Sequence, residues 1–263
     1  MNTQNNTLST GWATFIYAIL IIVIILSGWI APKGLNWIIV GISMFLFIIV
    51  MGLNITGRSL GILINERKLM SLSRFQIVLW TVIILSAYFT MVFVRIRSGI
   101  PNPLEIEMDW HLWALMGIST TSLVGTPLIQ SVKKTKEPDE SAYTQNNSNG
   151  GVVNKWNENQ ATVDENREGI LYGNKNVSDA RFSDMFEGDE LWNTEYIDMS
   201  KVQMFFFTII AVLSYVVVLF NMFTNDSEKL KEFPVLSEGL IAILAISHAG
   251  YLGSKSVDHT KVK

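Results

Sequence analysis

Six long apolar runs, separated by shorter polar stretches, form the main pattern along the chain. They cover residues 12–31, 35–53, 75–94, 110–129, 203–223 and 235–254. Each run is close to the ~20 residues that an α-helix needs to cross ~30 Å of hydrocarbon. The runs are continuous, whereas membrane strands alternate apolar and polar residues. The pattern therefore predicts an all-α integral membrane protein with six transmembrane helices.

Related strings recur in these runs, which indicates an internal repeat. SRFQIVLWTVIILSAY at 73–88 returns as SKVQMFFFTIIAVLSY at 200–215, a spacing of 127 residues. ALMGISTTSLVG at 114–125 returns as AILAISHAGYLG at 242–253, a spacing of 128 residues. Self-similarity at a fixed spacing is typical of repeated structural units. We therefore expect two tandem two-helix repeats that run parallel to each other across the membrane.

The pattern divides the chain into five parts. They are an N-terminal transmembrane hairpin (1–54), a basic cytoplasmic or interfacial segment (55–72), a first membrane repeat (73–131), an acidic cytoplasmic segment (132–199), and a second repeat with a basic tail (200–263). Most Lys and Arg residues near the spans fall on the side of the two termini, and loops rich in these residues stay in the cytoplasm. Both termini are therefore expected to be cytoplasmic.

The polar segments allow more than one interpretation. Residues 55–72 mix Leu and Ile with basic residues, which fits either an interfacial amphipathic helix or a basic loop. The stretch 133–151 is polar and poor in large aliphatic residues, so we expect it to be disordered. The part at 164–198 contains Phe, Tyr, Trp and Leu, with Ser178 or Ser183 available as a helix cap. It is expected to dock on its own membrane domain, and the alternative is that it binds a cytosolic protein.

Each copy of the first repeated string begins with Ser-x-x-Gln. Ser73 with Gln76, and Ser200 with Gln203, fit the capping box, in which both side chains bond to first-turn amides. The alternative is that the two glutamines line a cytoplasmic vestibule. Further along each copy, a basic residue, a threonine and a tyrosine follow at intervals of seven. These are Arg74, Thr81 and Tyr88 in the first copy, and Lys201, Thr208 and Tyr215 in the second.

Residues seven apart lie on one helix face with ~20° of drift, so each trio forms a polar stripe. We expect both stripes to turn inward and to bring Thr81 and Thr208 close together. Four further polar residues lie within predicted spans: Ser119, Thr120, Ser247 and His248. An ionisable side chain inside a membrane helix is a functional candidate by default. The alternative for His248 is a neutral imidazole that bonds to a neighbouring helix.

Composition and motifs argue against an enzyme. Only 16% of the 263 residues are charged and 49% are hydrophobic, and there is no cysteine, which excludes disulfides and thiolate metal sites. Ser247 and His248 are adjacent on a helix and diverge by ~100°, so they cannot act as a nucleophile and its base. No phosphate loop, dinucleotide fingerprint or metal-ligand spacing occurs. We expect no catalytic residues, no cofactor and no bound metal.

The C-terminal third carries a family resemblance. The strings RFSDMFEGDE, YIDMSKVQMFFFTIIAVLSY and LSEGLIAILAISHAGYL resemble a family of uncharacterised bacterial multispan membrane proteins. These share a D-x-S-K-V-Q-M-F-F-F-T element and a G-I-S-H-A-G-Y-L element. The chain departs from the family at Ala245, where the family has Gly, whereas Gly117 keeps the glycine in the first repeat. The resemblance implies the bacterial inner membrane and carries over no activity.

Two functional hypotheses remain. In the first, the chain is a small channel or transport component, because two parallel repeats around an axis along the membrane normal often enclose a substrate path. In the second, it is a scaffold or sensor whose acidic segment 164–198 binds a cytosolic protein while the spans anchor it. The lipid bilayer is a partner in both, a homo-oligomer is compatible with both, and nucleic acid is not expected.

Overall fold

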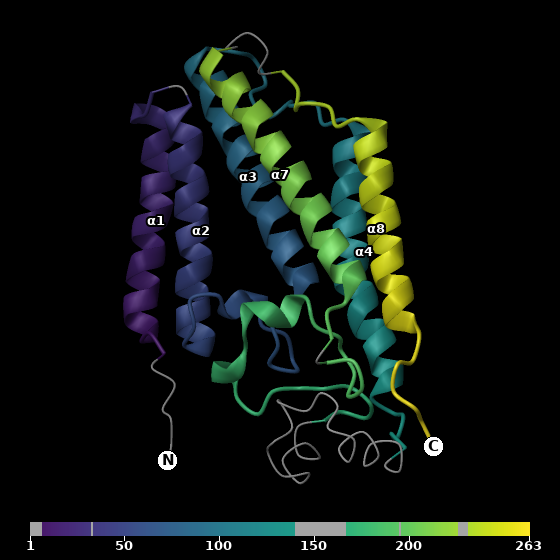
Figure 1. Cartoon of the computed structure of the whole chain (residues 1–263). Helices are drawn as coiled ribbons and strands as arrows, with labels where there is room; N and C mark the ends of the chain where they lie inside the picture. Colours follow the sequence, from purple (N-terminus) through teal and green to yellow (C-terminus); the bar gives the residue numbers. More distant parts are fainter. Residues whose placement is uncertain (1–6, 33, 140–166, 195, 226–230) are drawn as a thin grey trace. The chain divides into compact units, whose positions relative to one another are not determined.

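The computed structural model describes residues 7–32, 34–139, 167–194, 196–225 and 231–263 (Figure 1). Within them the long helices are α1 (Thr10–Ile30), α2 (Leu35–Thr56), α3 (Leu72–Arg97), α4 (Trp110–Lys133), α7 (Met199–Asn225) and α8 (Glu238–Ser256). Three short 3-10 turns are η1 (Gly61–Leu63), η2 (Val177–Asp179) and η3 (Phe182–Met185). Extended residues in the described part form isolated bridges only. The predicted all-α class with six long helices is confirmed.

Most of these helices can cross a bilayer. Five of them, α1, α2, α3, α4 and α7, are long and apolar enough to do so. The sixth, α8, is 19 residues long and carries Ser247, His248 and Lys255 as buried polar residues, which makes it less apolar. The chain is therefore a multi-pass membrane protein.

The chain forms two compact units. The first comprises Met1–Ile62, Phe75–Gly117 and Thr208–Ala242, and the second comprises Leu63–Arg74, Ile118–Phe207 and Ile243–Lys263. Helices α3, α4, α7 and α8 each contribute residues to both units. The two units are described separately below.

In the first unit, aromatic and polar contacts join neighbouring helices. Helices α1 and α2 form an antiparallel hairpin (Figure 1), in which the rings of Tyr17 and Phe47 stack with centroids 4.3 Å apart. The indole Nε1 of Trp37 on α2 donates to Ser86 Oγ on α3 at 3.0 Å. Helix α3 in turn contacts α7, where the rings of Trp80 and Tyr215 meet edge to face at 6.1 Å.

In the second unit, α4 packs closely against α8. Gly125 faces Leu252, and a Cβ added to that glycine would lie 3.4 Å from the leucine side chain. Small residues permit this close approach between membrane helices. The chain after residue 167 then folds back on the end of α4, because the Ile170 N–H donates to the Lys133 carbonyl at 3.3 Å. Docking of the acidic segment on its own membrane domain is thus observed, and binding of a cytosolic protein stays a prediction.

The interfacial helix considered for 55–72 is wrong, and the basic-loop interpretation describes this segment. Residues 63–71 form a tight hairpin in which the Asn65 N–H donates to the Leu69 carbonyl at 2.8 Å. The Asn65 side chain accepts from the Arg67 N–H at 3.0 Å. The reason lies in burial. Leu63, Ile64, Leu69 and Met70 are packed inside protein and do not form one exposed apolar face.

The polar stretch after α4 is ordered where the structure describes it. The Asp139 N–H donates to the Lys261 carbonyl at 2.9 Å, and the Lys263 N–H donates to the Glu137 carbonyl at 3.1 Å. Residues 134–139 therefore pair with the C-terminal tail, which corrects the expected disorder there. The rest of that stretch, 140–151, lies outside the described residues.

The inward faces of α3 and α7 repeat at a different spacing from the sequence motif. In α3 the buried positions include 73, 76, 80, 83, 84, 87 and 91, and in α7 they include 201, 204, 208, 211, 212, 215 and 219. These sets coincide at a spacing of 128 residues, one more than the spacing of the aligned strings. One residue turns a helix face by ~100°. Thr208 is therefore buried while its sequence counterpart Thr81 is exposed, and the prediction that these threonines face each other is wrong.

Candidate functional site

A buried carboxylate in the second unit gathers three cations from separate parts of the chain. Asp189 Oδ1 accepts from Arg67 Nη2 at 2.8 Å and from Lys201 Nζ at 3.2 Å, and Oδ2 accepts from Lys255 Nζ. The Arg67, Lys201 and Lys255 side chains are 3%, 4% and 6% exposed, and that of Asp189 is 15% exposed. We call these four residues the Asp189 cluster. Cations this deeply buried need a paired anion.

Local structure brings each cation to the carboxylate. The 63–71 hairpin presents Arg67, whose Nη1 also donates to the Tyr172 carbonyl at 2.8 Å. Lys201 lies in the first turn of α7, which Asp198 caps by accepting the Ser200 N–H at 2.9 Å. Lys255 lies in the last turn of α8.

Two opposing effects act on the acidity of Asp189. Burial raises the pKa of its carboxyl, but the charges of Lys201, Lys255 and Arg67 outweigh burial and hold this pKa well below its usual range. Opposite charges within a few ångströms favour the ionised form in this way. The carboxylate therefore stays charged throughout the physiological pH range.

A second buried ion pair lies beside the cluster. Glu190 Oε1 pairs with Lys133 Nζ at the end of α4. Glu190 Oε2 accepts the backbone N–H groups of His259 at 2.8 Å and Thr260 at 2.6 Å. The same lysine donates to the Val257 carbonyl at 2.6 Å. Adjacent acids thus hold the end of α4, the C-terminal tail and the 63–71 hairpin to one turn.

Polar side chains continue from these charges along the facing sides of α4 and α8. The buried ones are Ser119, Ser122, Thr126 and Gln130 on α4, with Ser247, His248 and Tyr251 on α8. We call this set the polar seam. Its helical positions differ by three or four, so they form one face of each helix.

Hydrogen bonds connect the seam from helix to helix. Ser122 Oγ and His248 Nδ1 are 2.6 Å apart. Thr126 Oγ1 donates to the Tyr251 hydroxyl at 3.3 Å, and that hydroxyl lies 3.1 Å from Ser73 Oγ. Three other buried atoms, Ser119 Oγ, Ser247 Oγ and Gln130 Nε2, have no hydrogen-bond partner in the described part of the chain. The seam is therefore only partly satisfied by protein groups.

Two of the predicted capping serines do other work. Helix α3 begins at Leu72, so Ser73 already lies inside it and bonds to Tyr251. Its partner Gln76 donates from Nε2 to Thr208 Oγ1 at 2.5 Å. At α7 the ionised Asp198 is the cap and Gln203 is exposed, because a carboxylate one residue earlier accepts the first-turn amides. Both capping boxes, and a vestibule lined by both glutamines, are wrong.

Acidic side chains likewise take the roles expected of Ser178 and Ser183. Both serines lie inside 3-10 turns. Asp179 accepts the Asn176 N–H at 3.0 Å, and Asp184 accepts the Arg181 N–H at 2.8 Å. These carboxylates fix the starts of η2 and η3.

The remaining candidates divide between the site and the surface. Lys201, Thr208, Tyr215, Ser119, Ser247 and His248 are buried, whereas Thr81 and Thr120 are exposed. Arg74 donates to the Ile64 carbonyl at 2.7 Å, and the Tyr88 hydroxyl donates to the Leu104 carbonyl at 3.2 Å. The second polar stripe faces inward as predicted, and the first does not.

Sequence reasoning missed most of the charged site. The residues it did not single out are Arg67, Lys133, Asp189, Glu190, Tyr251 and Lys255. A signal was present on α8, where His248, Tyr251 and Lys255 follow at intervals of three and four and so share one face. No comparable signal marks Asp189, because its partners lie far away along the chain.

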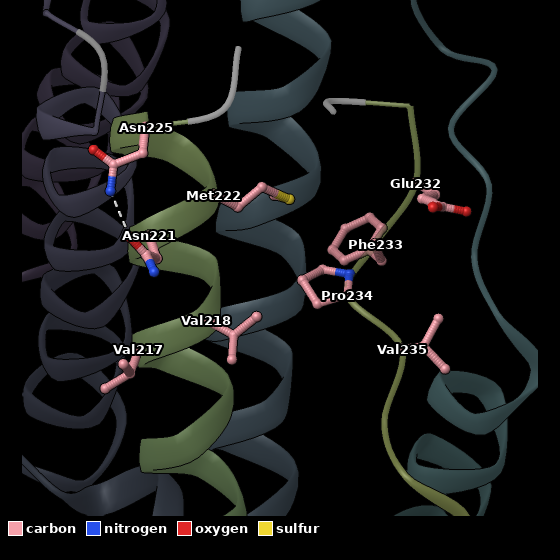
Figure 2. Close-up of a pocket in the computed structure, with 9 residues that line it drawn as sticks. All are labelled: Val217, Val218, Asn221, Met222, Asn225, Glu232, Phe233, Pro234 and Val235. Atoms are coloured by element: carbon pink, nitrogen blue, oxygen red, sulfur yellow. Dashed lines mark hydrogen bonds between the residues drawn. The ribbon is translucent and has the colours of Figure 1, made fainter. Parts of the chain in front are cut away.

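The first unit contains a separate groove of about 510 Å³. Figure 2 shows it between the last turns of α7 and the extended residues that precede α8. Its lining is formed by Val217, Val218, Asn221, Met222, Asn225, Glu232, Phe233, Pro234 and Val235. The two asparagines bond to each other, Asn225 Nδ2 to Asn221 Oδ1, at 2.5 Å. Apolar side chains make up most of the remaining wall.

Comparison with known proteins adds no relative. No family model, no curated protein and no solved structure matches this chain. Among the described residues, no group of three His, Cys, Asp or Glu side chains could hold a metal ion. The fold and the site together define a multi-pass helical membrane protein whose helices enclose a polar seam beside a buried charge cluster.

Proposed function

We propose that the protein is a small channel or transport component of the bacterial inner membrane. The observation that carries this proposal is the polar seam of α4 and α8. An unpaired polar group inside a membrane costs several kcal/mol, yet Ser119 and Ser247 each bury a hydroxyl without a partner among the described residues. Water or a polar solute between the helices would satisfy both. A helix pair that served only as an anchor would need no such groups.

The Asp189 cluster supports a closed end for this path. It ties the last turn of α8 and the first turn of α7 to the 63–71 hairpin, while the neighbouring pair of Lys133 and Glu190 ties down the end of α4. Movement of a solute past these helix ends requires the ion pairs to separate. In this proposal the cluster therefore acts as a gate.

Orientation and compartment rest on the sequence. The excess of Lys and Arg beside the termini supports cytoplasmic termini. The family resemblance of the C-terminal third supports the bacterial inner membrane. Both belong to the proposal.

Flux through liposomes tests the proposal. The purified protein is expected to carry water, protons or small ions across liposomes at a rate above that of empty vesicles. Ser247→Leu should fill the seam with an apolar side chain and lower this flux at least tenfold. Thr120→Leu is the matched control, because Thr120 is exposed on α4 and its replacement leaves the seam unchanged. Wild-type flux equal to that of empty liposomes for every solute would contradict the proposal.

A further inference from the structure

A small enclosed cavity lies among the charges of the second unit. Its volume is about 20 Å³, which is room for about one water molecule. Polar and charged side chains form much of its wall: Asn65, Arg67, Thr126, Gln130, Asp184, Asp189, Lys201, Tyr251 and Lys255. A monatomic ion is of comparable size, whereas phosphate, sulfate and carboxylates are too large.

Two hydrogen-bond donors in this wall have no acceptor. Arg67 Nε and Gln130 Nε2 are buried without a partner in the described part of the chain, and the two residues are only 5% and 9% exposed. Both atoms can donate but not accept. Leaving a buried donor unpaired costs about 1–3 kcal/mol, and more for a charged group. Both donors therefore need a common acceptor inside the cavity.

The charges around the cavity favour an anion over a neutral acceptor. Arg67, Lys201 and Lys255 line it together with Asp184 and Asp189, which leaves one positive charge in excess. Both acids are already engaged, since Asp189 accepts from all three cations and Asp184 accepts the N–H groups of Met70 and Arg181.

The nearest other charges do not change this balance. Lys133 and Glu190 neutralise each other beside the cavity. Asp198 lines an adjoining cavity of about 10 Å³, and its Oδ1 accepts from the start of α7. One bound monovalent anion would complete the charge balance of the wall.

We propose that this cavity is a binding site for a single monatomic anion, chloride in the cell. Gln130 Nε2 and Arg67 Nε donate to the ion, and Lys201 and Lys255 supply the surrounding positive charge. The ion stabilises the arrangement that holds the Asp189 cluster together. This site does not depend on the proposed transport function, because a structural ion would bind equally in a protein that carries nothing.

Replacement of chloride tests the site in the full-length protein in detergent. At constant ionic strength, the melting temperature is measured as sodium gluconate is exchanged for sodium chloride. Chloride and bromide should raise it along a saturable curve, by roughly 5–10 °C at a concentration 100 times the Kd. Gluconate and sulfate are too large to enter. Radioactive chloride should bind to the wild-type protein with a stoichiometry of one.

Gln130→Leu keeps the side-chain size and removes the donor, so it should abolish the chloride-dependent shift. Gln203→Leu is the matched control, because Gln203 is exposed on α7, and it should keep the shift. Equal melting in chloride and gluconate, without radioactive chloride binding, would show that water fills the cavity and would overturn the inference. A chloride shift that survives in Gln130→Leu would overturn it as well, since the ion would then bind elsewhere. If Gln130→Leu does not fold, chloride binding to the wild-type protein decides the question alone.

Discussion

Asp189 is the residue on which the charged site depends. Three buried cations point to its carboxylate, and no other side chain in the described part of the chain pairs with all three. Removal of one member of a buried ion pair leaves an uncompensated charge, which costs far more than the net contribution of the pair.

Asp189→Asn should therefore lower the free energy of unfolding by about 3–5 kcal/mol. The amide keeps the shape of the side chain but leaves Arg67, Lys201 and Lys255 without their anion. Denaturant or thermal unfolding in detergent measures the change. Glu66→Gln is the control, because Glu66 is exposed in the same hairpin and should change stability by less than about 0.5 kcal/mol. Equal stability of the two variants would show that the cluster does not stabilise the fold.

The pH dependence of the wild-type protein follows from the same carboxylate. The pKa of Asp189 is lower in the folded protein than in the unfolded chain, where a value near 4 is usual. Its contribution is therefore complete above about pH 4 and is lost as the pH falls toward the folded-state pKa. The stability difference between wild type and Asp189→Asn should shrink below about pH 4 and stay constant from pH 6 to pH 8.

At the scale of elements, the helices were predictable and their rotation was not. Continuous apolar runs located all six long helices, because the length of a membrane span is set by the bilayer. The aligned strings placed Thr81 and Thr208 in equivalent positions, but the buried face of α3 is one residue out of step with that alignment. Helix α3 also packs against α2 through Trp37 and Ser86. An extra neighbour for one copy only is a tertiary effect that a repeat alignment does not contain.

Crosslinking tests which face of α3 meets α7. The chain has no natural cysteine, so two can be introduced without further changes. Gln76→Cys with Thr208→Cys should react efficiently with a short bifunctional thiol reagent in native membranes, because the two side chains are in hydrogen-bond contact. Thr81→Cys with Thr208→Cys should not, because Thr81 is exposed. The opposite result would restore the arrangement suggested by the aligned strings.

At the scale of the whole molecule, the membrane class was predictable and the charged site was not. Hydropathy and composition follow from neighbouring residues, and they indicated a multi-pass protein. The site brings together residues from the 63–71 hairpin, an acidic turn and two helix ends. Arg67 and Asp189 are 122 positions apart, and no periodicity links such positions. Only the docking of an aromatic-rich segment was foreseen, because its apolar side chains needed a surface to cover them.

Topology is testable with reporter fusions. Insertions at Asn149 and at Ser227 lie in polar stretches on opposite sides of α7, so they should report opposite compartments. The excess of Lys and Arg near the termini predicts that a periplasmic phosphatase is inactive at Asn149 and active at Ser227. A cytoplasmic reporter should show the reverse pattern. Active phosphatase at Asn149 would invert the proposed orientation.

The order of the cluster residues along the chain has a consequence for biosynthesis. Arg67 leaves the ribosome 122 positions before Asp189, which at about 5–20 residues per second is a delay of roughly 6–24 s. Lys255 follows Asp189 by a further 66 positions. During this interval the early arginine has no carboxylate to pair with, and anionic lipid headgroups are the counter-charge at hand. Assembly of the nascent protein then requires a lipid contact to be exchanged for a protein contact, so depletion of anionic lipids should slow its maturation.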